Sequence, residues 1–301
     1  MEENTEQRVD LTLFSEKIQE LKDRITSVIV GQEQTVDLVL TAILANGHVL
    51  IEGVPGVAKT LLARLTARLI DADFSRVQFT PDLMPSDVLG TTVFNMKTNG
   101  FDFHQGPIFA DIVLVDEINR APAKTQAALF EVMEERQISI DGTTHRMGDL
   151  YTILATQNPV EQEGTYKLPE AQLDRFLMKI TMDYPSLEEE VNILERHHTN
   201  AALVKLDDIV PAITKEELLS LRAFMNQVFV DRTLLQYIAL IVQQTRTSKA
   251  VYLGASPRAS VAMLQSSKAY ALLQGRDFVT PEDIKFVAPY VLCLLYTSDA
   301  A

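Results

Sequence analysis

The 301-residue sequence has little of several features that define protein classes. It has one cysteine, Cys293, so no disulfide can form within the chain, which fits a reducing compartment and predicts a cytoplasmic protein. Basic residues are scarce: 27 Lys and Arg stand against 41 Asp and Glu, which gives a net charge of −14. Such a surface repels phosphate backbones and anionic membranes. A nucleic-acid-binding role is therefore not favoured.

Long apolar runs are also missing. Runs such as 113–115 and 238–242 are far shorter than the roughly 20 residues that span a bilayer. Residues 1–6 carry neither the basic nor the apolar region of a signal peptide. The chain is thus predicted not to be membrane-inserted. Its 47% hydrophobic and 23% charged residues exclude disorder as the main state and suffice for more than one ordinary domain.

The first half of the chain alternates short apolar runs with helix-length stretches. The apolar runs cover residues 48–52, 76–80, 111–115, 151–156 and 176–182. Helical spacing of apolar residues occupies 61–70 and 123–136. Five strands separated by helices predict an α/β fold with a five-stranded parallel sheet covered on both faces.

The second half is helical, and the change occurs near Pro185. Helix-start signals follow that residue: Ser186 with Glu189, Thr214 with Glu217, and Ser256 before Pro257. An amphipathic helical segment over 11–29 precedes the first strand. The predicted division is an α/β core with this N-terminal segment (1–185), a linker (186–212), a smaller all-helical domain (213–292) and a tail (293–301).

Two predicted hairpins interrupt the first half. The stretch 91–103 contains an Asn99-Gly100 turn, and 138–145 contains an Asp141-Gly142 turn. A doubly wound domain does not need either hairpin, and function is commonly added to a scaffold by such insertions. Ordinary surface hairpins are the alternative.

A glycine-rich loop joins the first predicted strand to the first core helix. The loop is Gly53-Val-Pro-Gly-Val-Ala-Lys-Thr60, followed by Leu61. Consecutive backbone N–H groups and the helix N-terminus can surround a polyphosphate there, with Lys59 on the β and γ phosphates and Thr60 on Mg²⁺. Ala58 stands where this motif usually has its second glycine. The predicted nucleotide-contacting residues of the loop are Gly53, Val54, Pro55, Gly56, Val57, Ala58, Lys59, Thr60 and Leu61.

Two adjacent carboxylates end the strand predicted over 111–115. Asp116 and Glu117 would repel each other at a strand end unless a positive group lies nearby. Mg²⁺ bound to a nucleotide is such a group. We therefore assign Asp116, with Thr60, to the metal and Glu117 to polarising the attacking water. A solvated Asp-Glu pair is the alternative.

Five motifs in this order resemble those of the MoxR family of AAA+ ATPases, within the helix 2 insertion clade, over about 28–289. They are the loop at 53–60, whose Ala58 is also the family's form, and Val115-Asp-Glu-Ile-Asn-Arg-Ala-Pro122, which resembles a Walker B extension. Leu154-Ala-Thr-Gln-Asn-Pro159 is similar to a sensor 1 strand. The others are Leu168-Pro-Glu-Ala-Gln-Leu-Asp-Arg-Phe176 and Gly254-Ala-Ser-Pro-Arg-Ala259. The resemblance implies an AAA+ core followed by a helical lid.

The resemblance also implies roles for residues outside the loop. Asn158 would contact the γ-phosphate, unless Asn-Pro is only a strand exit. Arg175 would be the arginine finger for a neighbouring subunit's nucleotide, its rival role being a salt bridge to Asp174 or Glu170. Arg258 would be a sensor 2 arginine, with a surface position as the alternative; we expect it to share an anion with Lys59.

Further implied roles concern the adenine and a second arginine. Val30 and Gly31 would line the adenine pocket, although core packing explains the apolar residues there equally well. Arg120 is a second candidate for acting across a subunit interface. The hairpins at 91–103 and 138–145 correspond to the helix 2 and pre-sensor 1 insertions and are candidates for the loops that perform work.

The predicted function is Mg²⁺-dependent ATP hydrolysis by a ring, a homo-hexamer by family analogy, that acts as a chaperone. Such relatives are associated with von Willebrand factor A-domain proteins and with maturation, assembly or metal insertion of client proteins. A magnesium-chelatase-like motor subunit is the second hypothesis. A nucleic-acid remodelling ATPase is the third, disfavoured by the charge and by a 138–145 hairpin that offers only His145 with Arg146.

The last nine residues, Cys293 to Ala301, do not continue the helical pattern of 280–288. They resemble the translation of a sequencing adaptor. We therefore expect a non-native tail and a native sequence that stops near Leu292; a genuine short tail is the alternative.

Overall fold

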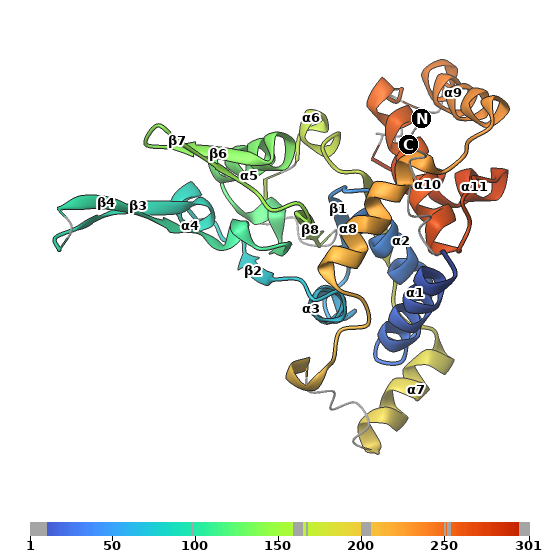
Figure 1. Cartoon of the computed structure of the whole chain (residues 1–301), viewed down its shortest axis with the longest axis horizontal. Coiled ribbons are helices and arrows are strands. Elements are labelled where there is room, and N and C mark those ends of the chain that lie inside the picture. The colour runs from blue at the N-terminus through green and yellow to red at the C-terminus, as the bar shows by residue number, and fades with distance from the viewer. Residues whose placement is uncertain are drawn as a thin grey trace, which may run out of the picture.

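A five-stranded parallel sheet forms the centre of the computed structural model, which describes residues 11–97, 99–158, 165–166, 168–199, 206–249, 251 and 254–294. The strand order is β2-β5-β8-β1-β9 (Figure 1). The strands are β1 (Val49–Gly53), β2 (Phe74–Gln78), β5 (Ile112–Asp116), β8 (Thr152–Gln157) and β9 (Met178–Met182). The five predicted strands are confirmed, with their ends shifted by at most two residues.

Because every strand of this sheet runs in the same direction, the sheet has two chemically different ends. We call them the amino end, where all strands begin, and the carboxyl end, where all strands finish. The strand β8 lies between β1 and β5. Residues that follow β1, β5 and β8 therefore meet at the carboxyl end.

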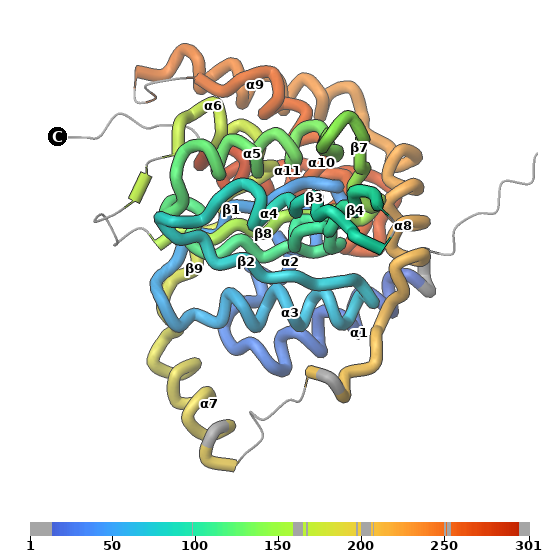
Figure 2. Tube along the Cα trace, turned by 90° about the vertical axis from the view of Figure 1, so that its left-hand side faces the viewer, coloured from blue at the N-terminus to red at the C-terminus, as the bar shows by residue number. Residues whose placement is uncertain are grey.

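Helices cover both faces of the sheet. On one face lie α1 (Leu11–Thr26), α2 (Glu33–Leu44) and α3 (Lys59–Leu69), and on the other lies α5 (Ala123–Glu135) (Figure 2). The alternation of a strand explains this packing: Val49 and Ile51 belong to the apolar cluster with α1 to α3, whereas Leu50 belongs to the cluster with α5. Both faces are thus buried, as the apolar runs predicted.

Two antiparallel hairpins extend from the same side of the core (Figure 1). They consist of β3 (Gly90–Asn95) with β4 (Gly100–Gln105), after the short helix α4 (Pro85–Leu89), and of β6 (Gln137–Ile140) with β7 (Thr143–Arg146). Asn99 and Asp141 adopt left-handed φ values of 51° and 48°, as the predicted turns require. The rings of Phe103 and His145 lie 4.3 Å apart between centroids, so the hairpins contact each other. Both hairpin predictions are confirmed.

The remaining elements are helical. They are α6 (Glu170–Leu173), α7 (Leu187–His198), α8 (Lys215–Phe224), α9 (Arg232–Thr247), α10 (Pro257–Leu273) and α11 (Pro281–Leu292), with 3-10 turns at Pro107–Phe109, Ile118–Arg120, Leu206–Asp208 and Met225–Gln227. The range predicted as a linker contains α7, and the predicted helical domain contains α8 to α11. The exact divisions stay predictions. None of the helices in the described part of the chain combines the length and apolarity needed to span a bilayer.

Two of the three predicted helix starts are capped by side-chain hydrogen bonds, whereas Ser256 precedes α10 without a capping bond. Thr214 and Glu217 form a reciprocal capping box at α8, and Ser186 and Glu189 exchange the same pair of bonds at α7. Helix α11 ends at Leu292, and Cys293 is its C-cap. The last seven residues of the predicted tail lie outside the described residues, as do residues 1–10.

A buried histidine joins the amino end of the sheet to α5. His48 is 4% exposed; its Nε2 donates to the Met133 carbonyl oxygen at 3.1 Å, and its Nδ1 accepts from the Ile153 backbone N–H at 3.0 Å. Nε2 already carries a proton, and Nδ1 accepts a hydrogen bond, so neither ring nitrogen can take up another proton. Burial and the nearby charge of Arg136 lower the pKa of His48 from 6.5 to about 3.

We therefore predict that the protein loses stability as the pH falls below 6.5. The unfolded chain then binds a proton at His48 that the folded chain excludes, so this loss continues down to about pH 3. Chemical denaturation at several pH values should show a slope for the wild type that exceeds that of His48→Gln by up to about 1.4 kcal/mol per pH unit. Equal slopes would contradict a neutral buried imidazole.

Candidate nucleotide-binding site

The glycine-rich loop follows β1 at the carboxyl end of the sheet and leads directly into α3. Gly56 has a φ of 91° and Ala58 a φ of 62°, so the loop turns through the left-handed region twice. Lys59 is the first residue of α3, and its Nζ donates to the Gly53 carbonyl oxygen at 2.6 Å. The loop thus curls back over its own start and directs its last N–H groups along the helix axis.

The space around the loop explains its small residues. A Cβ on Gly53 would lie 2.9 Å from the Met182 carbonyl oxygen of the neighbouring strand β9. A Cβ on Gly56 would meet nothing within 4 Å, so its left-handed φ is what favours glycine there. Ala58 carries a methyl group in the same region of φ, which costs on the order of 1 kcal/mol.

Asp116 ends β5 at the same end of the sheet. Its side chain is 10% exposed and holds two partners: Thr156 Oγ1 donates to Oδ1 at 3.0 Å, and Arg76 Nε donates to Oδ2 at 2.6 Å. The buried carboxylate therefore already lies against a positive charge. One positive group beside the acidic pair is thus supplied by the protein itself.

Glu117 has an unusual backbone. Its φ of 56° and ψ of 50° are left-handed, a strained conformation for a residue with a side chain. The Thr156 hydroxyl accepts from its N–H at 3.1 Å. Its Oε2 accepts from Gln78 Nε2 at 2.8 Å and from Arg120 Nη1 at 3.0 Å. The carboxylate predicted to polarise water is thus held by two donors of its own chain.

The other residues predicted to contact the nucleotide, apart from the two arginines, lie in two places. Asn158 is 8% exposed and follows β8 immediately, next to the end of β1 in the sheet order. Val30 and Gly31 lie in the turn between α1 and α2, where Gly31 has a left-handed φ of 73°. A Cβ on Gly31 would overlap the Glu189 carboxyl group, so this turn packs against α7.

Sequence reasoning missed three residues that contact the acidic pair: Arg76, Gln78 and Thr156. Arg76 and Gln78 belong to β2, whose register sets Gln78 opposite Asp116. The signal was present in the alternation of β2, where two polar residues flank the apolar Val77, but the strand order was needed to know which strand they face.

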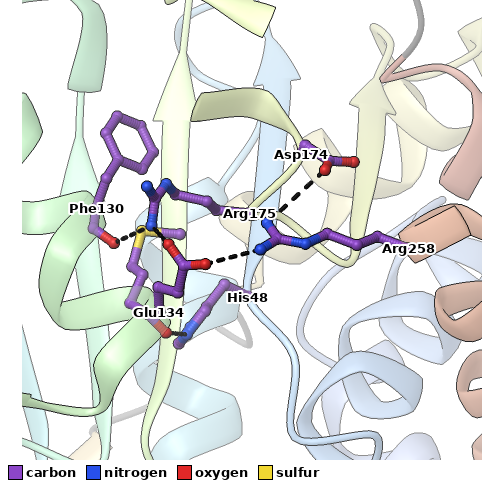
Figure 3. Close-up of polar contacts among 7 residues, drawn as sticks. His48, Phe130, Glu134, Asp174, Arg175 and Arg258 are labelled. Atoms are coloured by element: carbon purple, nitrogen blue, oxygen red, sulfur yellow. Dashed lines mark hydrogen bonds and ion pairs between the residues drawn. The ribbon is translucent and has the colours of Figure 1, made fainter. Parts of the chain in front are cut away.

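Arg175 and Arg258 lie together at the amino end of the sheet (Figure 3). Arg175 comes just before β9. Two residues later, the Leu177 N–H donates to the carbonyl oxygen of His48, which precedes β1. Arg175 Nη1 donates to the Phe130 carbonyl oxygen at 3.1 Å and pairs with Glu134. The predicted rival, a bridge from Arg175 to Asp174 or Glu170, is not among its contacts; the partner is Glu134.

Arg258 stands in the first turn of α10, where a cation opposes the helix dipole. Two core carboxylates compensate: Glu134 Oε1 accepts from Nη2 at 2.8 Å, and Asp174 Oδ2 lies 3.8 Å from Nη1 (Figure 3). The expected nearby anion is therefore present as carboxylates.

The expectation that Lys59 and Arg258 of one chain share an anion is wrong for this arrangement. Lys59 lies beyond the carboxyl end of β1, whereas the partners of Arg258 lie at the amino end. The strand alone separates the two ends by about 13 Å, because four residue steps rise about 3.3 Å each. Arg120, the other arginine considered for an interface, lies beside Glu117 of its own chain at the carboxyl end.

Comparisons with known proteins identify two regions of the chain. Residues 48–178 match the model of the ATPase family associated with various cellular activities (AAA), and residues 243–295 match that of the AAA lid domain. The crystal structure of a protein from Cytophaga hutchinsonii superimposes with a TM-score of 0.87 at 39% identity, covering 96% of this chain and 90% of that one.

Two bacterial relatives match nearly the whole chain. Chaperone MoxR1 of Mycobacterium tuberculosis is 45% identical over 92% of this chain and 75% of its own length. YeaC of Bacillus subtilis is 49% identical over 90% of this chain and 83% of its own length.

The left-handed conformation of Ala58 generates a stability prediction. Ala58→Gly should raise the free energy of unfolding by about 1 kcal/mol, because glycine carries no Cβ penalty at this φ. Gly56→Ala is the matched reverse change, since its Cβ has space but its φ is unfavourable, and it should lower stability. Denaturant unfolding without nucleotide measures both; a less stable Ala58→Gly protein would contradict the argument.

Proposed function

The chain belongs to the MoxR family of AAA+ ATPases, and we propose that it hydrolyses MgATP as a ring in which each active site is built from two subunits. One observation carries this proposal. The phosphate loop lies at the carboxyl end of the sheet, whereas Arg175 lies at its amino end with Arg258. A nucleotide held by Lys59 is therefore out of reach of its own chain's Arg175 and is open to a neighbour's.

The residues of the carboxyl end suit MgATP. Mg²⁺ prefers oxygen ligands and takes only one or two from the protein, which fits the Thr60 hydroxyl and the Asp116 carboxylate. Arg76 holds Asp116 Oδ2 in this structure, so the metal would share Asp116 with Arg76 or replace it there. When bound, Mg²⁺ would neutralise charge on the transferred phosphoryl group.

The protein groups around the phosphates have distinct proposed roles. Loop N–H groups and the Lys59 ammonium bind the β and γ phosphates. Glu117 accepts a proton from, or orients, the attacking water once it gives up its bonds to Gln78 and Arg120. The Asn158 amide, at the end of β8, helps hold that water against the γ-phosphate. Val30 and Gly31 are proposed to border the adenine.

The neighbouring subunit completes the site. An arginine supplied from another subunit stabilises the charge of the phosphoryl-transfer transition state, so hydrolysis depends on assembly. We assign Arg175 this role and expect Arg258 to approach the same phosphates from the neighbour's lid. A homo-hexamer is the ring that family analogy favours.

We further propose that the ring acts as a chaperone on partner proteins, in the cytoplasm. Its M. tuberculosis relative is named a chaperone. A von Willebrand factor A-domain protein is the partner class expected for this family, with the two hairpins as the contact surface. The magnesium-chelatase-like alternative shares the same site chemistry. For nucleic-acid remodelling, the β6–β7 hairpin offers only His145 and Arg146 as basic groups, and the His145 ring packs against Phe103.

Two variants separate binding from chemistry. Lys59→Ala should lose ATP binding because the loop loses its cation, whereas Glu117→Gln should bind ATP and fail to hydrolyse it. Fluorescent-nucleotide titration and phosphate release measure the two properties. Wild-type turnover by purified Glu117→Gln would overturn the assignment of Glu117.

Mixing of variants tests the two-subunit site. Arg175→Ala alone should lose roughly a thousandfold in kcat. Mixing it with Glu117→Gln should restore turnover, because a wild-type Glu117 then meets a neighbour's Arg175. The matched control mixes the double variant Glu117→Gln/Arg175→Ala with Glu117→Gln, which offers no complete site. No restoration in the first mixture, or activity per subunit that is independent of protein concentration, would argue for a monomeric enzyme.

A further inference from the structure

One carboxylate at the amino end of the sheet holds both arginines. Glu134, near the end of α5, directs Oε2 to Arg175 Nη1 and Oε1 to Arg258 Nη2, the latter at 2.8 Å (Figure 3). Each oxygen thus serves a different guanidinium. Two like charges this close would repel each other without the carboxylate between them.

Glu134 stands on a rigid part of the fold. The preceding residue, Met133, accepts from buried His48 through its carbonyl oxygen. Two residues later, Arg136 donates from Nη1 to the Tyr151 carbonyl oxygen at 3.0 Å. The end of α5 is therefore tied to the starts of β1 and β8, and the carboxylate of Glu134 has a defined position.

The partner of Glu134 in the lid is more accessible. The Arg258 side chain is 59% exposed, against 27% for that of Arg175. Ser256, just before α10, donates to Asp174 Oδ1 at 3.0 Å, so polar side chains join the start of this lid helix to the core. A cavity of about 490 Å³ lies beside both arginines and is bordered by Asp174 and His48.

Arg175 keeps donors for a further anion. Glu134 and Phe130 both accept from Nη1, and among the residues that the structure describes none accepts from Nη2. A guanidinium has five N–H donors in a planar fork. Glu134 therefore orients the group without saturating it.

We propose that Glu134 is a positioning residue for the ATPase reaction: it holds Arg175 and Arg258 as one unit toward the nucleotide of the neighbouring subunit and so couples the lid to that nucleotide. The inference rests on the proposed action of Arg175 across a subunit interface. An anion that reaches the pair accepts hydrogen bonds from both guanidiniums. Because Glu134 is also bonded to Arg258, any displacement of the pair is transmitted to α10. The lid thus responds to the neighbour's γ-phosphate.

The test compares kinetics of Glu134→Gln with those of the wild type in the assembled ring. Glutamine keeps the size of the side chain but not its charge, so kcat should fall about tenfold, a usual size for coupled neighbours. The KM for ATP and nucleotide affinity should stay within about twofold, because the phosphate loop is untouched. Glu131→Gln is the matched control: Glu131 is exposed one turn earlier on α5, has no ion pair with a described residue, and should leave both constants unchanged.

Coupling is tested by a double-variant cycle. If Glu134 acts through Arg258, adding Arg258→Ala to Glu134→Gln should lower kcat by less than it does in the wild type. Spin labels at Lys124→Cys on α5 and Gln244→Cys on α9, in a Cys293→Ser background, report the lid position directly. The distance between them should differ between ATP-loaded and ADP-loaded rings, and the difference should shrink with Glu134→Gln.

The outcomes distinguish this inference from the function on which it rests. Wild-type kcat for Glu134→Gln, with Arg175→Ala inactive, overturns the role of Glu134 and leaves the two-subunit site standing. Full activity of Arg175→Ala overturns both. A parallel loss of kcat, ATP affinity and thermal stability in Glu134→Gln would show a purely structural role and would also overturn the inference.

Discussion

The parallel direction of all five sheet strands is the constraint on which the rest of this molecule depends. It collects at one end everything that follows β1, β5 and β8: the phosphate loop, the Asp116 and Glu117 pair, and Asn158. It collects at the opposite end what precedes β9, including Arg175. The groups that bind phosphate and the arginine suited to stabilise its transfer are thus separated by the length of a strand. In the ring that we propose, a complete site forms where two copies of the chain meet, amino end to carboxyl end.

Within the single chain, charged side chains are paired with partners at both the carboxyl end and the amino end of the sheet. At the carboxyl end Arg76 neutralises Asp116, while Gln78 and Arg120 hold Glu117. At the amino end the carboxylate of Glu134 serves two arginines. Binding of MgATP between two subunits would exchange these internal partners for substrate. Without nucleotide, partners from its own chain hold each group in a defined position. The exchange gives a physical route from the nucleotide of one subunit to the lid of the next.

Much of the fold follows from local patterns, because the signals are short-range. Apolar runs bounded by breakers located the strands to within two residues, and the Asn99 and Asp141 turns located the hairpins. The loop that contains Lys59 could be predicted for the same reason, because its strand, loop and helix are contiguous in the sequence. The pairing of Glu134 could not be predicted, because it joins α5, the segment before β9 and α10, which are distant in sequence. The end of the sheet at which Arg258 lies likewise depends on tertiary packing, and the sequence argument therefore placed it too close to Lys59 of its own chain.

The most direct test is a structure of the assembled ring formed by Glu117→Gln with ATP bound. The account predicts that each ATP contacts Lys59 of one subunit and Arg175 of the next, with Arg258 of that next subunit on the same phosphates and Glu134 still contacting both arginines. It would be contradicted if each nucleotide were enclosed by residues of a single chain. It would equally be contradicted if the subunit interface left Arg175 more than a side chain's reach from every phosphate.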